Sequence, residues 1–116
     1  MDKEKIIKNF NQELSKGSMV MVVLSLLRRE KYGYDLVNQM KEEGFEIEQN
    51  TLYPMLRRLE KQGLLESNWE VSTSRPRKYY KTTEFGQDVL GELTSLYYDS
   101  VNRTKRVLKE EDNGKD

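Results

Sequence analysis

The clearest hydrophobic pattern in the chain lies in residues 50–61, NTLYPMLRRLEK. On a helical wheel the apolar residues of this stretch fall on one face and its polar and basic residues fall on the other. Gly63 follows at the position where helices commonly end in a left-handed residue. The stretch therefore predicts a helix with one packing face and one cationic face, although a basic helix face is often simply solvated. The packing face is Leu52, Met55, Leu56 and Leu59, and the cationic face carries Asn50, Pro54, Arg57, Arg58 and Lys61.

The chain before this stretch begins with two segments that contain apolar residues. Residues 1–17 have apolar side chains at helical spacing in a polar background, which predicts an amphipathic helix. Residues 15–18, SKGS, then predict a break or a bend. Residues 19–30 are apolar nearly all round, and their valines make a strand a competing interpretation, but we favour a buried helix. The apolar residues of the first segment are Ile6, Ile7, Phe10 and Leu14.

A third helix is predicted for about residues 33–43, where Gly44 ends it. Its apolar residues share one face, and Tyr34 lies on the other. Residues 45–48 connect this helix to the one at 50–61. Two helices joined by a short connector that contains glycine predict a helix-turn-helix.

After Gly63 the pattern changes to the alternation that is typical of a strand. Residues 65–71 alternate, residues 72–76 are rich in turn formers, and residues 77–82 are the expected returning strand. Aromatic pairs across the two strands are expected to hold this hairpin, with Trp69, Tyr79 and Tyr80 as their members. Its basic residues have no acid among them, and they are Arg75, Arg77, Lys78 and Lys81. A basic loop tip is usually only solvated, but behind a cationic helix it predicts the wing of a winged helix-turn-helix domain over residues 18–83.

The last element is a long helix over residues 84–109, with Thr83 as its expected N-cap. An apolar stripe follows it for about seven turns at 3.6 residues per turn. So long a stripe exceeds what the small domain can cover, so a symmetric homodimer is expected. The charged residues 110–116 are expected to be a disordered tail. The stripe is Phe85, Val89, Leu90, Leu93, Leu96, Tyr97, Ser100, Val101, Thr104, Val107 and Leu108.

Composition excludes several kinds of chemistry. The 116 residues include 20 basic and 20 acidic side chains, so the net charge is zero and only the distribution of charge is informative. The chain has no cysteine and no histidine, which excludes disulfides, Cys/His zinc sites and histidine-based acid–base catalysis. It also has no phosphate loop, metal cluster or paired acid and base, so we expect neither an enzyme nor a cofactor or metal.

The longest apolar run, residues 19–27, is far shorter than the roughly 20 residues that a membrane span needs. The chain does not open on a basic segment followed by an apolar one, as a signal peptide does. We therefore expect one mainly α domain with a small β-hairpin, in the cytoplasm and without a membrane partner.

Six short motifs occur along the chain: Glu13-Leu14-x-Lys16-Gly17-Ser18, Leu24-Ser25-Leu26-Leu27, Tyr32-Gly33-Tyr34-x-Leu36, Thr51-Leu52-Tyr53-Pro54-x-Leu56-x-Arg58-Leu59-Glu60-x-x-Gly63-Leu64, Arg75-Pro76-Arg77-Lys78-Tyr79-Tyr80 and Thr83-Glu84-x-Gly86. In this order and spacing they resemble the PadR-type bacterial transcriptional regulators, in the short form without a separate ligand domain. Each motif alone is weak, but the set is specific and covers roughly residues 13–108.

The resemblance implies a homodimeric repressor that binds an inverted repeat in DNA and is released by a small effector. The C-terminal helix would form the dimer interface with the N-terminal helix of the partner. The chain departs from the family at Glu48, where a small capping residue is usual, and at Gln49-Asn50, where Pro-Gly is frequent. An acid is unfavourable near phosphate, so two orientations are open for Glu48: it points back to cap the helix, or it faces DNA.

The expected site residues belong to three sets. Residues at the start of the 50–61 helix are placed to reach base edges, and basic residues further along and in the wing are placed to reach phosphates. Tyr34 would donate to a phosphate, or it is a half-exposed tyrosine without a special role. The expected DNA-binding residues are Tyr34, Gln49, Asn50, Thr51, Tyr53, Arg57, Arg58, Lys61, Arg75, Arg77 and Lys78. The expected dimer contacts are Phe10, Leu90, Leu93, Leu96, Tyr97, Val101 and Val107.

The third set is a candidate pocket for a small aromatic effector. It consists of Tyr97, Ser100 and Thr104. The last two side chains are smaller and more polar than a tightly packed dimer interface would favour. The resemblance implies that an aromatic residue near this position lines a drug-binding pore between subunits. The alternative, which is the commoner role of such a side chain, is that Tyr97 simply packs in the dimer interface. The alternative to DNA binding is a winged-helix protein-interaction module, in which the same basic residues bind an acidic protein surface.

Overall fold

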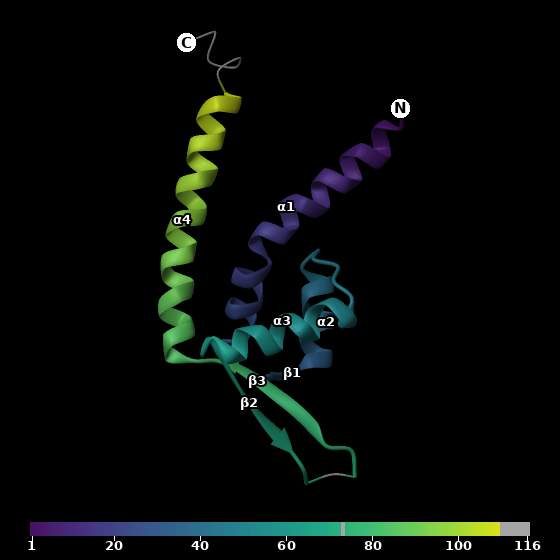
Figure 1. Cartoon of the computed structure of the whole chain (residues 1–116), viewed down its shortest axis with the longest axis vertical. Coiled ribbons are helices and arrows are strands. Elements are labelled where there is room, and N and C mark those ends of the chain that lie inside the picture. Colours follow the sequence, from purple (N-terminus) through teal and green to yellow (C-terminus); the bar gives the residue numbers. More distant parts are fainter. Residues whose placement is uncertain (73, 110–116) are drawn as a thin grey trace.

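The computed structural model describes residues 1–72 and 74–109 of the chain (Figure 1). Its elements in chain order are α1 (Lys3–Leu26), β1 (Lys31–Tyr32), α2 (Gly33–Glu42), α3 (Gln49–Lys61), β2 (Leu65–Glu70), β3 (Arg77–Thr82) and α4 (Glu84–Leu108). The predicted architecture is confirmed: in the described residues, three helices pack around a small antiparallel sheet, and a long C-terminal helix follows it. The expected disordered tail, residues 110–116, lies outside the described residues.

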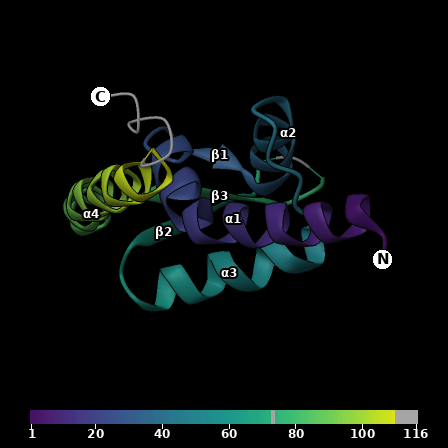
Figure 2. The same cartoon turned by 90° about the horizontal axis from the view of Figure 1, so that it is seen from above.

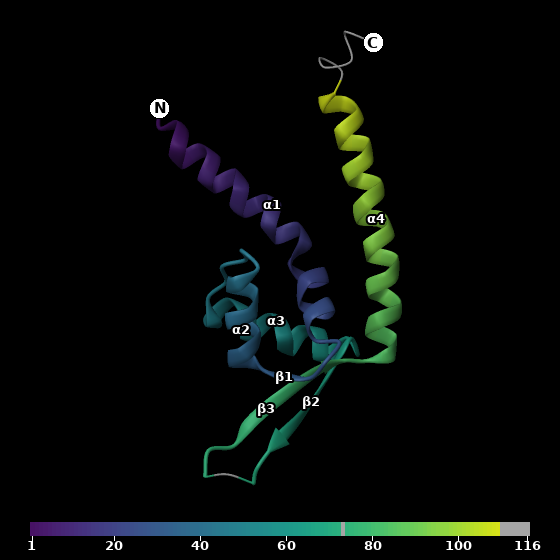
Figure 3. The same cartoon turned by 180° about the vertical axis from the view of Figure 1, so that it is seen from behind.

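Helix α1 is one continuous element, so residues 15–18, for which a break or a bend was expected, do not break it. Asp2 caps its start by accepting a hydrogen bond from the Lys5 N–H at 3.2 Å. Further along, the Ser18 hydroxyl donates to the Ser15 carbonyl at 3.1 Å, a bond that a helical backbone allows. A glycine at position 17 weakens a helix by only about 1 kcal/mol relative to alanine. Figures 1 and 3 show that the helix bends along its course without being interrupted.

The two helices of the predicted helix-turn-helix end in the way that their glycines predict. Gly44 and Gly63 have φ values of 91° and 79°, a region that side-chain-bearing residues avoid. After α2, the Phe45 N–H donates to the Met40 carbonyl at 2.8 Å, and after α3 the Leu64 N–H donates to the Leu59 carbonyl at 2.9 Å. These bonds satisfy carbonyls that a helix end leaves without partners.

The sheet has the strand order β1-β3-β2, with β3 antiparallel to both neighbours. The hairpin β2–β3 matches the prediction, and it projects from the domain on the side away from the free ends of α1 and α4 (Figure 3). Strand β1 was not predicted, because two residues are too few for an alternating pattern. It exists through its pairing with β3, where Lys31 lies opposite Tyr80 and Tyr32 lies opposite Tyr79.

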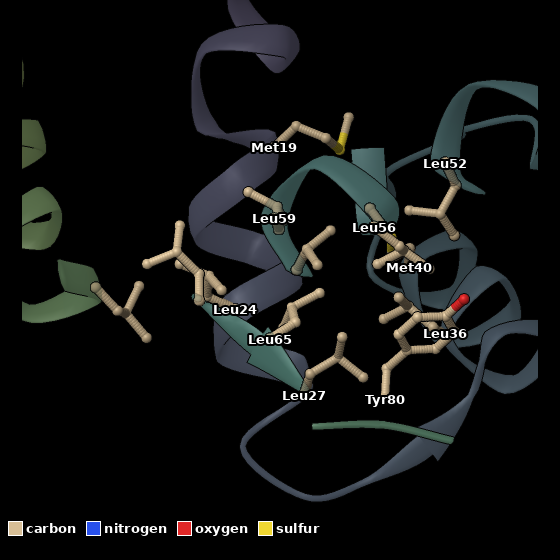
Figure 4. Close-up of a cluster of buried hydrophobic side chains, with 13 residues drawn as sticks. Met19, Leu24, Leu27, Leu36, Met40, Leu52, Leu56, Leu59, Leu65 and Tyr80 are labelled. Atoms are coloured by element: carbon tan, nitrogen blue, oxygen red, sulfur yellow. The ribbon is translucent and has the colours of Figure 1, made fainter. Parts of the chain in front are cut away.

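One hydrophobic core joins the second half of α1 to α2, α3 and the base of the hairpin (Figure 4). The Thr82 hydroxyl is buried there and donates to the Leu24 carbonyl at 2.8 Å, and the Thr82 N–H donates to the Leu27 carbonyl at 2.8 Å. The end of α1 is therefore bonded directly to the end of β3. The core residues are Met19, Val23, Leu24, Leu27, Leu36, Met40, Leu52, Leu56, Leu59, Leu64, Leu65, Tyr80 and Leu90.

Beyond this core, the first half of α1 and most of α4 project outward and diverge (Figures 1 and 2). The chain measures 64 × 36 × 22 Å. Its radius of gyration is 17.7 Å, whereas a compact domain of this length would have about 13 Å. In the described part of the chain, no helix has both the length and the apolar character needed to cross a membrane.

A tight junction connects the hairpin to α4. The Thr83 hydroxyl caps α4 by accepting a bond from the Gly86 N–H at 2.9 Å, and it donates to the Gly63 carbonyl at 2.6 Å. The Thr83 N–H donates to the Leu64 carbonyl at 3.0 Å. A Cβ on Gly86 would overlap that same carbonyl oxygen and would lie 2.7 Å from the Thr82 methyl group. Only glycine lets the first turn of α4 pack this closely, and the predicted N-cap is confirmed.

We expect Gly86→Ala to lower the free energy of unfolding by about 1–3 kcal/mol or more, because a backbone carbonyl cannot move aside as a flexible side chain can. Gly91→Ala is the matched control on the same helix, since a Cβ there meets nothing within 4 Å. It should be neutral or stabilising by up to about 1 kcal/mol, because alanine is the better helix former. Urea unfolding followed by circular dichroism measures both, and equal stabilities would contradict the described packing of α4.

Candidate nucleic-acid interface

Helix α3 buries one face and exposes the other, as the sequence predicts. Leu52, Leu56 and Leu59 are buried against the rest of the domain. The exposed residues are Gln49, Asn50, Thr51, Pro54, Arg57, Arg58 and Lys61. Six of the predicted DNA-binding residues therefore lie on one accessible surface, with polar residues in the first turn and cations further along. Free backbone N–H groups and the helix dipole also make the start of a helix favourable for phosphate.

Glu48 occupies the N-cap position of α3 but does not cap it through its side chain. Its backbone is extended, with φ −82° and ψ 151°, and its carbonyl accepts the first helical bonds from Thr51 and Leu52. The side chain makes no capping hydrogen bond and is exposed. Of the two orientations open for Glu48, the one that caps the helix is therefore wrong. The departure from the usual small capping residue leaves a carboxylate at the edge of the exposed surface.

Two tyrosines of the predicted set are placed differently. Tyr34, in the first turn of α2, is 63% exposed and available to a ligand. Tyr53 is half-buried and packs against the hydrophobic core. Its ring lies so close to Gly33 that a Cβ on that glycine would come within 2.6 Å of it. Tyr53 thus has a structural contact that explains its presence, which the sequence analysis did not assign to it.

A carboxylate near the end of α3 contacts both strands of the wing. The Ser67 hydroxyl of β2 donates to Glu60 Oε2 at 2.5 Å, and the Lys78 ammonium of β3 lies 3.8 Å from Glu60 Oε1. Lys78 also lies 5.8 Å and 5.5 Å from the ring centroids of Trp69 and Tyr80. The sequence grouped Lys78 with the cations of the wing tip, whereas the structure turns it toward α3 and matches its charge with Glu60.

A stack of three side chains lies at the other edge of the sheet. The rings of Tyr32 and Tyr79 are stacked with centroids 4.1 Å apart, and the Arg77 guanidinium lies 4.7 Å from the Tyr32 ring centroid. The Tyr79 hydroxyl donates to that of Tyr32, and this bond, followed by burial, raises the pKa of Tyr79 to about 12. Tyr32 is also the residue before α2, so the stack ties the wing to the helix-turn-helix. Arg77 is exposed, as is Arg75 in the turn.

Sequence reasoning missed Tyr32 and Glu60, and it misplaced the aromatic pairs of the hairpin. Trp69 lies opposite Lys78, so the predicted aromatic pairing across β2 and β3 is wrong. Tyr80 belongs to the core, and Tyr79 pairs instead with the unpredicted strand β1. The contact of Glu60 with the wing depends on how the hairpin folds back under α3. No local pattern carries that information.

The predicted dimer contacts range from buried to exposed within the single chain. Leu90 is buried, and Leu93 and Val101 are half-buried. The remaining four are exposed: Phe10 by 61%, Leu96 by 62%, Tyr97 by 42% and Val107 by 70%. The apolar face of the first half of α1 is exposed as well.

A cavity of about 430 Å³ lies between α1 and α4. Tyr97 lines it together with Tyr98, and the two rings meet edge to face with centroids 5.2 Å apart. Ser100 and Thr104 do not line it, because they lie further along α4 than the part that α1 covers, and both are exposed. Within residues 1–72 and 74–109, no group of three or more His, Cys, Asp or Glu side chains is placed to hold a metal ion.

These features define a winged helix-turn-helix protein with an exposed cationic helix beside a basic hairpin. The chain belongs to the PadR-like family of transcriptional regulators, whose family model matches residues 23–92. A PadR family regulator from Eggerthella lenta is 44% identical and superposes with a TM-score of 0.90, over 92% of this chain and 96% of that one. Transcriptional regulator Rv3488 of Mycobacterium tuberculosis is 38% identical over 63 residues, which are 54% of this chain and 59% of that protein.

A third similar structure is Bacillus subtilis PadR in complex with operator DNA. It is 27% identical, with a TM-score of 0.61, and the match covers 66% of this chain and 45% of that one.

The hydrogen bond between Tyr79 and Tyr32 can be tested by titration. Tyr32→Phe keeps a ring for stacking but removes the hydroxyl that accepts the bond, so the pKa of Tyr79 should fall from about 12 toward its ordinary value of 10. Tyrosine ring carbon shifts followed by NMR across alkaline pH measure this change. Phe85→Tyr, at an exposed position on α4, is the control and should leave the Tyr79 titration unaltered. An unchanged Tyr79 pKa in Tyr32→Phe would contradict the described bond.

Proposed function

We propose that the protein is a sequence-specific repressor that binds double-stranded DNA through α3 and the wing. The observation that carries this proposal is the exposed face of α3, which combines Asn50 and its neighbours in the first turn with Arg57, Arg58 and Lys61 further along. Amide side chains pair bidentately with adenine in the major groove, and the cations suit phosphates. The complex of the related B. subtilis protein with operator DNA supports the same use of the fold.

A selection of duplexes from a random library by the purified protein tests this proposal. A sequence-specific regulator should enrich one motif, and a symmetric dimer should enrich it as an inverted repeat with half-sites about one helical turn, or a multiple of it, apart. A protein-interaction module would enrich no motif and would show only weak binding that disappears with salt.

Asn50 is the residue that we expect to read a base. Asn50→Ala should weaken binding to the selected duplex by about 1–3 kcal/mol and relax the preference at one position of each half-site. Asn102→Ala is the matched control, because Asn102 is exposed on α4, far along the chain from α3. Repeating the selection with both variants measures the preference. If the motif from Asn50→Ala equals that of the wild type, another residue reads the sequence.

We also propose a homodimer that covers the projecting helices. The exposed apolar residues of α1 and α4 support it, since large apolar patches on a soluble chain usually mark an interface. Leu96 and Val107 are eleven residues apart and so share one face of α4, three turns from each other. Both are more than half exposed, which means that a single folded chain does not depend on them.

Replacing Leu96 and Val107 together by Asp should therefore give a folded monomer, because burying two carboxylates in the interface costs several kcal/mol. Sedimentation velocity measures the mass, and circular dichroism confirms that the helices remain. Asn102→Asp adds a charge to the same helix on a different face and should leave the dimer intact. A double variant that sediments as the wild type does would place the interface elsewhere.

A small aromatic effector would bind in the cavity between α1 and α4, where the edge-to-face Tyr97 and Tyr98 rings offer a surface for stacking. It would release DNA only by favouring one arrangement of the two α3 helices over another. Planar aromatic compounds should bind the wild type and lower its affinity for the selected duplex, and Tyr97→Ala should lose both effects. Binding that leaves DNA affinity unchanged would remove this regulatory role without affecting the repressor proposal.

A further inference from the structure

Trp69 is the chain's single tryptophan, and the fold does not bury it. The side chain is 62% exposed near the end of β2, and its neighbour Val71 is 71% exposed. Its cross-strand partner is Lys78. An indole carries a large apolar area and a polar N–H, and such side chains are enriched where proteins meet partners. Within the domain the ring has Lys78 beside it, and most of the indole stays exposed.

The pleat of β2 sets the direction in which the indole points. Side chains two residues apart lie on the same face of a strand. Leu65 points into the core and Ser67 donates to Glu60 of α3, so Trp69 continues the face of the hairpin that is turned toward α3. Figure 1 shows the hairpin extending past α3 and away from the domain. Trp69 thus lies on the side of the wing that faces α3.

This part of the surface carries the cations Lys78 and Arg57, and Glu60 balances the charge of Lys78. The Lys78 ammonium lies 5.8 Å from the Trp69 ring centroid. Tyr80 lies two residues from Lys78 on the same face of β3. Burial, followed by the charge of Glu60, raises the pKa of Tyr80, and the nearby positive charge of Arg57 opposes this rise. A partner that fits must offer flat apolar surfaces for the indole, together with acceptors for its N–H and for the exposed Arg57. The sugar–phosphate backbone of a duplex does so, through its phosphates and the faces of its deoxyribose rings.

The geometry of the domain also favours this partner over an acidic protein. If α3 enters the major groove and the wing reaches the next groove, the strand that separates the two grooves passes between α3 and the hairpin. Trp69 and Lys78, which are paired across β2 and β3, would line the hairpin side of that passage. The indole N–H is a donor for a phosphate oxygen, and the ring can pack on a sugar.

We propose that Trp69 is a DNA-contacting residue of the wing, which packs against the sugar–phosphate backbone between the two grooves. This inference rests on the proposed function, and it assigns Trp69 a role in affinity that is independent of base sequence. It replaces the structural role that the aromatic pattern of the hairpin predicted.

Because Trp69 is the only tryptophan, its fluorescence reports on this contact in the unmodified protein. Acrylamide should quench the emission efficiently in the free protein, and saturation with the selected duplex should abolish most of that quenching. Trp69→Ala should weaken binding to every duplex sequence by about tenfold, which corresponds to about 1.4 kcal/mol, without changing the enriched motif. Phe85→Ala removes another exposed aromatic ring, at the start of α4, and should leave DNA affinity unchanged.

The outcomes separate this inference from the proposed function. If the protein enriches a motif and binds it while acrylamide still reaches Trp69, the contact is wrong and the repressor proposal stands. If no duplex is enriched or bound, both fail. Poor quenching in the free protein that improves on dilution would show that a second copy covers Trp69, which also overturns the inference. The quenching experiment needs no variant, so a Trp69→Ala protein that fails to fold does not affect it.

Discussion

The contact between the first turn of α4 and the Leu64 carbonyl is the constraint on which the arrangement of the chain depends. Gly86 makes it sterically feasible, and the Thr83 hydroxyl and N–H bond to the carbonyls that follow α3. One residue earlier, Thr82 bonds to the end of α1. The ends of α1, α3 and β3 and the start of α4 therefore meet at one place. Their angles are fixed there by backbone hydrogen bonds, which tolerate little displacement.

The elements that the sequence predicted correctly are those with local causes. Gly44, Gly63 and Thr83 determine helix ends through their own backbone conformation or a bond within three residues, so their positions can be read directly. The exposed face of α3 was also predictable, because a helical period sorts apolar from polar residues without knowledge of the partner. What could not be predicted depends on pairing between distant segments. Strand β1 has no pattern of its own and exists only because β3 lies beside it.

The distribution of charge shows the same limit. A count of basic residues in the wing treated Arg75, Arg77 and Lys78 as equivalent, but the fold distinguishes them. Lys78 is 30% exposed and faces Glu60, and Arg77 lies against the Tyr32 ring. Glu60 is part of α3, so the same helix that presents cations outward also supplies the anion that positions the wing. In a chain with zero net charge, which acid lies near which base decides what surface remains positive.

The unbroken course of α1 has a structural consequence. Its 24 residues form one continuous, bent helix with a path of about 36 Å at 1.5 Å per residue. The far arm is exposed, and the near arm ends at the Leu24 and Leu27 carbonyls, which bond to Thr82 at the base of the wing. Val23 and Leu24 are fully buried beside these bonds. The segment that would contact the partner subunit in the proposed dimer and the segment that holds the base of the wing therefore belong to one continuous helix.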